Sequence, residues 1–102
     1  MPNNYELLLM AIKNRQQVKG CYDGYYREMC PHAMGWKNGS HHVLSFQFAG
    51  ESSRILPPGG QWKCMDIDGI NIVSVSDGQW FTDSRHSRPQ TCIDQIEVEV
   101  SY

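Results

Sequence analysis

Apolar residues near the start of the chain recur at the spacing of a helix. One face of that helix collects four of them, at the i, i+3, i+4 and i+7 positions: Tyr5, Leu8, Leu9 and Ile12. An asparagine at position 3 or 4 is a suitable N-cap, and Gly20 is hostile to further helix. The pattern predicts a helix over residues 4–15.

After the helix the pattern changes to short β-prone runs. The runs cover residues 18–22, 25–29, 43–48, 62–67, 70–75 and 96–102. Asp23-Gly24 and Asn38-Gly39 lie between such runs and favour two-residue hairpin turns, because both central residues of a type I′ turn need a positive φ. Pro31 has no backbone N–H, so we expect it at a sheet edge, a bulge or a strand end.

Alternation assigns faces to the strands. Leu44, Phe46 and Phe48 should face the core, and they alternate with the set Val43, Ser45 and Gln47. In the last strand, apolar residues alternate with Glu97 and Glu99, which predicts an acidic solvent face. Residues 49–61 are rich in Gly, Pro and Ser and are predicted to form a loop of the kind that often carries function.

This order predicts a mainly β fold, a small barrel or sandwich of about five to six strands with an N-terminal α-helix. We expect a single domain over residues 1–102, with the helix at about 4–15, the barrel at about 18–81 and the C-terminal strand at about 93–102. A chain of 102 residues and 11.7 kDa supports one core and no second domain.

Composition narrows the classes of function. The net charge of -2 excludes a polyanion binder that relies on overall charge, and the 40% hydrophobic content excludes a disordered chain. The apolar run at residues 7–12 is too short for a membrane span. No Lys or Arg precedes it, so no signal peptide is expected and a cytoplasmic location is predicted.

The four cysteines are Cys21, Cys30, Cys64 and Cys92, and none of them forms a C-x-x-C pair. With no export signal, we expect four reduced and mostly buried thiols rather than disulfides or a zinc site.

Three sequence blocks carry a family resemblance. The first is "LLLMAIKNRQQVKGCY", the second "YYREMCPHAMGWKNGSHHVLSFQF" and the third "WKCMDIDGINIVSV". In order and spacing, over residues 7–75, they resemble a WYL domain. The matching positions are Ala11, Ile12, Arg15, Val18, Tyr22, Arg27, Pro31, Asn38, Gly39, Leu44, Met65, Ile67, Asp68 and Ile70.

The departures from the family pattern concern its signature. The signature Trp-Tyr-Leu falls on His42-Val43-Leu44, so only the leucine is kept, and a late family arginine is Gly69. The winged-helix domain that WYL transcription factors usually carry does not precede the blocks. The resemblance implies an SH3-like or Sm-like barrel behind a helix, and a regulatory, ligand-sensing role in bacteria or phages, with nucleotide-like ligands or pieces of nucleic acid.

The candidate ligand-binding residues are Tyr25, Arg27, His42, Arg54 and Lys63. Arg27 offers a fork for phosphate, and the alternative is a solvated arginine on a strand. His42 can stack on a base or pair with phosphate, and the alternative is an exposed strand start. His41 should point to the opposite face, so the two histidines do not form an obvious ligand pair. No metal site, cofactor or catalytic residue is predicted.

The favoured function is a non-enzymatic sensor for a nucleotide-like molecule or short single-stranded nucleic acid. A second hypothesis is a protein-interaction subunit that assembles through barrel edges. A third is a hydrolase of a nucleotide that uses His42 and Asp68, which no motif supports. Asp66 and Asp68 share a strand face, but an ordinary turn at Asp68-Gly69 and a solvent-facing Asp66 beside Lys63 explain them better than acid–base chemistry does.

Overall fold

The computed structural model describes residues 3–51, 60–82 and 92–100, and all structural statements concern these residues. In chain order the elements are α1 (Asn4–Asn14), β1 (Gln17–Tyr22), β2 (Tyr25–Lys37), β3 (Ser40–Gly50), β4 (Gln61–Asp66), the 3-10 helix η1 (Ile67–Gly69), β5 (Ile70–Ser76) and β6 (Gln95–Glu99). The predicted helix and the mainly β character are confirmed.

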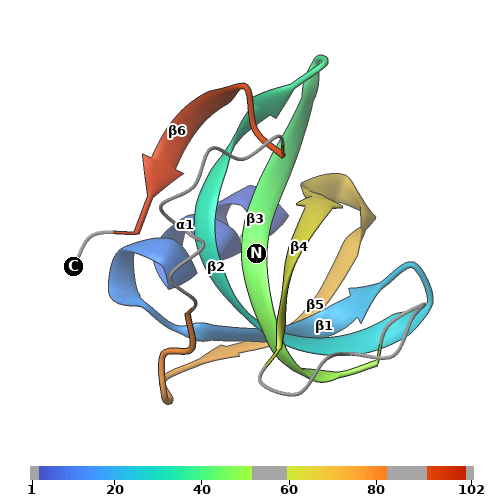
Figure 1. Cartoon of the computed structure of the whole chain (residues 1–102), viewed down its shortest axis with the longest axis vertical. Coiled ribbons are helices and arrows are strands. Elements are labelled where there is room, and N and C mark those ends of the chain that lie inside the picture. The colour runs from blue at the N-terminus through green and yellow to red at the C-terminus, as the bar shows by residue number, and fades with distance from the viewer. Residues whose placement is uncertain (1–2, 52–59, 83–91, 101–102) are drawn as a thin grey trace.

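The strands form one antiparallel sheet in the order β4-β3-β2-β1-β5, and β6 pairs with β2 off this path. The sheet curves strongly, and α1 lies beside β2 at one side of it (Figure 1). The ends of the strand order, β4 and β5, are not paired with each other. The described strands therefore form an open curved sheet rather than a closed barrel.

The longest strands are β2 and β3, and β2 has two different neighbours on one edge. Its first half pairs with β1 up to Met29, and its second half pairs with β6 from Ala33 to Trp36. Pro31 lies in the gap between these partners, beside a register shift toward β3. Its missing N–H is tolerated there, so the predicted bulge position is confirmed, whereas the prediction that this strand ends near residue 29 is wrong.

Local signals set the helix and both hairpin turns. Asn3 caps α1, since its side chain accepts a hydrogen bond from the N–H of Glu6 at 2.9 Å. Asp23 and Asn38 both have positive φ, as do the glycines after them, which is the conformation that a type I′ turn requires. Among the described residues, no helix is long and apolar enough to cross a membrane.

Asn4 links the helix to the open side of the sheet. Its side-chain amide donates to the backbone oxygens of Ile67 at 2.8 Å and Ile70 at 2.7 Å. These two carbonyls flank η1, which joins β4 to β5. One side chain from the start of the chain therefore holds the connection between the two unpaired end strands.

The prediction that β3 buries one face only is wrong. Leu44 and Phe46 are buried as expected, but Val43, Ser45 and Gln47 are fully buried on the other face. The reason is that both faces of the strand are covered. Val43 packs in the cluster formed with α1, while Leu44 packs with Ala33, Cys92 and Ile93.

The prediction of four reduced thiols is also wrong. Cys64 and Cys92 form a disulfide with their Cα atoms 5.5 Å apart, while Cys21 and Cys30 are free. The two bonded cysteines are 28 residues apart in sequence, and only the folded sheet brings them together. Cys64 lies opposite Leu44 in the β3–β4 ladder, and Cys92 packs against that same leucine.

Candidate ligand-binding site

Arg27 is a buried cation on the inner face of the curved sheet. It is placed by the first half of β2, and only 5% of the residue is exposed. Its Nε donates to the backbone oxygen of Tyr22 at 3.3 Å, and its Nη1 donates to Oε1 of Gln47 at 3.2 Å. The alternative of a solvated strand arginine is therefore wrong.

Two tyrosine rings flank the guanidinium. Its Cζ lies 5.5 Å from the ring centroid of Tyr22 and 5.7 Å from that of Tyr25. Tyr22 and Tyr25 are direct partners across the β1–β2 hairpin, and Arg27 is two residues beyond Tyr25, so all three side chains share one face. The structure thus brings together Tyr25 and Arg27, two of the predicted residues.

The guanidinium has no carboxylate partner within the described part of the chain. The two ion pairs found there join Lys19 to Glu28 and His41 to Glu97. A buried charge that meets only neutral groups is unfavourable, because it has lost water without gaining a counter-charge. An anion bound beside Arg27 would supply that counter-charge.

Gln47 completes the surroundings of Arg27, and the sequence analysis did not select it. It is fully buried, and its Nε2 donates to the backbone oxygens of Ala49 at 3.1 Å and Glu51 at 2.8 Å. These bonds turn its oxygen toward Arg27. The sequence analysis missed it because alternation placed Leu44, Phe46 and Phe48 toward the core and Gln47 on the other face of the strand.

An open cavity of about 410 Å³ lies beside this cluster, lined by Tyr22, Asp23 and Gly69. Tyr22 belongs to both the cavity and the Arg27 cluster, and its hydroxyl accepts a hydrogen bond from the N–H of Asp66 at 3.2 Å. Asp23 is exposed in the hairpin turn, so its carboxylate is free to accept hydrogen bonds from a molecule in the cavity.

Two of the predicted cations remain, Lys63 and Arg54. Lys63 is half-buried and pairs with Ser45, which places it on the same face of the sheet as Gln47 and Arg27. Arg54 lies outside the described residues.

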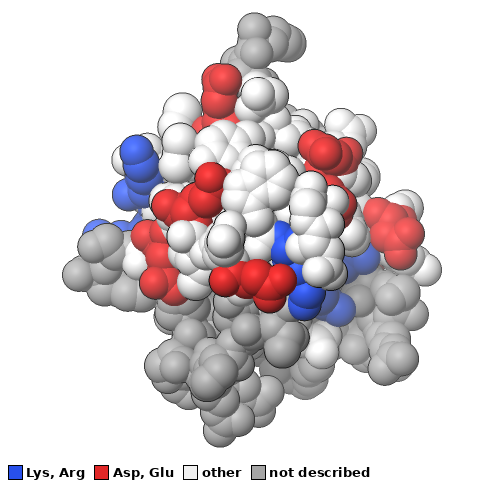
Figure 2. Space-filling model, turned by 90° about the horizontal axis from the view of Figure 1, so that it is seen from above, with Lys and Arg blue, Asp and Glu red and all other residues white. Residues whose placement is uncertain are grey.

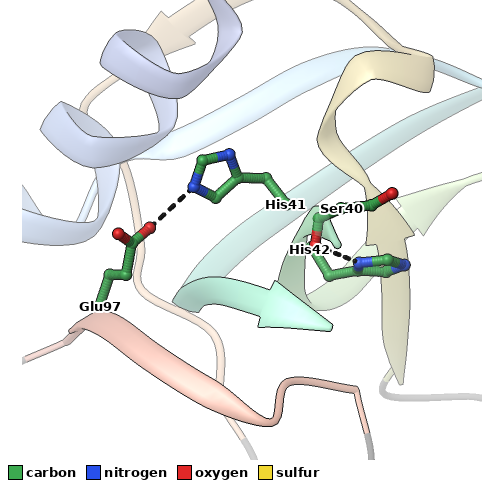
Figure 3. Close-up of polar contacts among 4 residues, drawn as sticks. All are labelled: Ser40, His41, His42 and Glu97. Carbon is green, nitrogen blue, oxygen red and sulfur yellow. Dashed lines mark hydrogen bonds and ion pairs between the residues drawn. The ribbon is translucent and has the colours of Figure 1, made fainter. Parts of the chain in front are cut away.

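His42 does not join the Arg27 cluster. Five regular ladder positions separate it from Gln47 along β3, so the two side chains are on opposite faces. Figure 3 shows His41 and His42 pointing away from each other, as alternation predicts. His42 Nδ1 lies 3.1 Å from the backbone oxygen of Ser40, and the residue is half-buried rather than an exposed strand start.

His41 takes part in a second cluster at the other end of the sheet. Its Nε2 lies 2.8 Å from Oε1 of Glu97, and its ring centroid is 3.7 Å from that of Trp36 and 5.1 Å from that of Tyr5. Asp and Glu side chains are spread over this end of the molecule (Figure 2).

Two further polar side chains, Asp66 and Cys30, have structural partners. Oδ1 of Asp66 accepts from the N–H of Asp68 at 3.0 Å and so caps η1. The Cys30 thiol accepts a hydrogen bond from the N–H of Phe81, but burial dominates and raises its pKa to about 11. Within the described ranges, no group of three or more His, Cys, Asp and Glu side chains is placed to hold a metal ion.

No protein-family model, curated protein or solved structure matches this chain. The resemblance to WYL domains therefore stays a prediction, and the candidate site depends on its own geometry.

Proposed function

We propose that this chain is a non-enzymatic binding module for a nucleotide-like molecule or a short single-stranded nucleic acid, with Arg27 as the phosphate-binding residue. The observation that carries the proposal is the buried guanidinium, which meets only neutral partners among the described residues. Its regulatory, ligand-sensing role and its membership of the WYL family belong to the same proposal.

The fold supports this proposal at the level of architecture. A helix precedes the sheet, and the 3-10 helix η1 leads into β5, which pairs with β1. The resemblance to WYL domains implies a barrel of the SH3 or Sm type, and the order of these elements is compatible with one. In this proposal the inner face of the sheet is the ligand-binding face.

The chemistry of the cluster suits a phosphate attached to a planar base. A guanidinium presents parallel N–H donors to phosphate oxygens, and aromatic rings offer faces on which bases stack. Tyr22 and Tyr25 lie next to Arg27, and Asp23 at the cavity offers an acceptor for an amino group of a base.

Calorimetric titration with ribonucleoside monophosphates and short RNA oligonucleotides tests the proposal. Arg27→Lys retains the charge and the aliphatic stem but loses the two parallel donors of the guanidinium. The Kd should therefore rise by about 10-fold to 100-fold, which corresponds to the free energy of one hydrogen bond to a charged group. Nucleosides without phosphate should bind no better to the native protein than to Arg27→Lys. Lys13→Gln, which removes an exposed cation of α1, is the matched control and should bind as the native protein does.

Two results contradict the proposal. One is a folded Arg27→Lys variant, judged by circular dichroism, that keeps the native affinity. The other is a native protein that binds none of these probes at millimolar concentration.

The alternative function, a protein-interaction subunit, has one specific observation in its favour. β5 is an end strand with no charged residue, and Val73 in it is 67% exposed. An uncharged end strand offers free backbone groups for pairing with another chain. Light scattering that shows a concentration-dependent oligomer, abolished by Val73→Lys, would favour this alternative over the ligand-binding module.

A cytoplasmic location is part of the proposed function, because nucleotide-like signals of this class act inside the cell. Disulfides are uncommon in that compartment. The Cys64–Cys92 bond is therefore unusual for the proposed location, and a measurement of how readily cellular thiols reduce it tests that location.

A further inference from the structure

The Cys64–Cys92 disulfide connects two parts of the sheet that the ladder leaves apart. Cys64 lies on β4, at one end of the strand order, and Cys92 lies three residues before β6. β4 pairs with β3, while β6 pairs with β2. The bond therefore ties the chain that enters β6 to a strand that β6 does not contact through the ladder.

The two sulfur atoms differ in accessibility. Cys64 is an exposed residue, whereas Cys92 is 6% exposed and packs with Ala33, Leu44 and Ile93. Thiol–disulfide exchange needs access to one sulfur, in line with the attacking thiolate. Attack is thus directed to Cys64, and Cys92 is the leaving sulfur.

Each sulfur atom lies near a backbone oxygen that can accept a hydrogen bond from its thiol once the disulfide is reduced. Sγ of Cys92 lies 3.7 Å from the backbone oxygen of Val43, and Sγ of Cys64 lies 3.8 Å from the backbone oxygen of Cys92. A disulfide sulfur carries no hydrogen and makes no use of these oxygens, but a thiol donates weakly to them. The sulfur atoms have to move apart on reduction, and each thiol then has a backbone oxygen nearby to which it can donate.

β6 is the strand that directly follows the disulfide in the chain. It has five residues, pairs with one strand and leaves Ile96 48% exposed. The exposed strands and segments of a protein open before its core does, because few buried contacts hold them. Breaking the disulfide should therefore increase the local opening of β6 before that of the other strands.

We propose that Cys64–Cys92 is a reversible dithiol–disulfide site, exchanged by cellular thiol reductants such as glutathione, that clamps β6 onto β2 in its oxidised state. Reduction loosens β6 while β1 to β5 and α1 remain folded. This inference is independent of the proposed ligand.

The exchange proceeds in two steps. A glutathione thiolate attacks Sγ of Cys64, the Cys64–Cys92 bond breaks, and the electron pair leaves on Sγ of Cys92, which takes up a proton. A second glutathione thiolate attacks the glutathione sulfur of the mixed disulfide and releases Cys64 as a thiolate, which is then protonated. The products are two protein thiols and one molecule of oxidised glutathione.

The experiment combines thiol counting with hydrogen exchange on the full chain. The protein is equilibrated in mixtures of reduced and oxidised glutathione, alkylated and analysed by mass spectrometry, and a shift of two thiols is expected as the mixture becomes more reducing. In the reduced protein, amides of β6 should exchange about 10-fold faster or more, while those of the β1–β2 hairpin keep their protection.

Two variants separate the clamp from other effects. Cys64→Ser should show the fast exchange of β6 without any reductant. Cys21→Ser, which removes a free thiol from β1, should respond to glutathione as the native protein does. The proposal is overturned if the oxidised protein contains four free thiols, or if the bond resists excess glutathione. It is also overturned if β6 is unchanged on reduction, or if every strand loses protection together, which would make the bond a structural staple of the whole fold.

Discussion

The two halves of β2 are built in different ways. The first half, up to Met29, pairs with β1 through a turn of two residues and buries Arg27 between the two tyrosines. The second half, from Ala33, pairs with β6, a strand from the far end of the sequence. The chain around β6 is tied to β4 by the Cys64–Cys92 disulfide and to β3 by the ion pair of His41 with Glu97.

The two halves share β3 as a neighbour on one edge and differ on the other edge. There the first half pairs with β1, which precedes it by a turn of two residues, whereas the second half pairs with β6 from the far end of the sequence. The site proposed at Arg27 lies on the half that β6 does not pair with, so a change in β6 need not disturb it.

The largest expected effect tests the second half. Gly35→Ala places a Cβ on the carbonyl oxygen of Gln95 and 2.8 Å from Cγ2 of Ile93. Because the backbone of β6 has to move, we expect a loss of about 3 kcal/mol or more in the free energy of unfolding, measured by urea denaturation. Hydrogen exchange should show faster exchange in β6 than in β1.

Gly69→Ala is the control for this substitution, since its new Cβ meets only the ring of Tyr22, at 3.1 Å. A side chain moves more easily than a backbone, so the loss should stay below about 1 kcal/mol. A Gly35→Ala protein as stable as the native one would show that β6 is not held where the structure places it.

An intermediate effect tests the first half. Gln47→Leu leaves Nη1 of Arg27 without its acceptor and the oxygens of Ala49 and Glu51 without their donor. Unsatisfied buried polar groups should lower the free energy of unfolding by about 2 kcal/mol. Gln61→Leu, at the exposed cross-strand partner of Gln47, should change it by less than about 0.5 kcal/mol. Equal effects in thermal or urea unfolding would contradict the assigned network.

The smallest effect tests the ion pair beside β6. Glu97 and His41 are partly exposed, so Glu97→Gln should lower the free energy of unfolding by less than about 1 kcal/mol. Asp94→Asn removes a nearby exposed carboxylate that makes no side-chain hydrogen bond or ion pair among the described residues, so it should have no measurable effect. A loss above about 2 kcal/mol for Glu97→Gln would mean that this pair, rather than the disulfide, is the main attachment of β6.

Local patterns in the sequence predicted the elements that depend on neighbouring residues. The cap at Asn3, the turns at Asp23 and Asn38 and the bulge near Pro31 each follow from the chemistry of one or two side chains. Tyr25 and Arg27, two of the predicted site residues, lie side by side because they are two residues apart on one strand.

The rest depends on contacts between distant residues. The disulfide of Cys64 with Cys92 was missed because a spacing of 28 residues carries no motif. Gln47 was missed because alternation gives the two faces of a strand but not whether both are covered. His42 was grouped with Arg27 on a family alignment, and strand parity puts them on opposite faces.

Asn4 adds a constraint on the order of folding. The two backbone oxygens that its amide reaches lie 63 and 66 residues further along the chain. A ribosome-bound chain that has exposed only the helix and the first hairpin lacks these acceptors, so α1 docks with its start unanchored until η1 has emerged. Long sequence separation of this kind slows folding. Asn4 therefore reaches its native hydrogen bonds only after η1, 63 residues further along the chain, is in place.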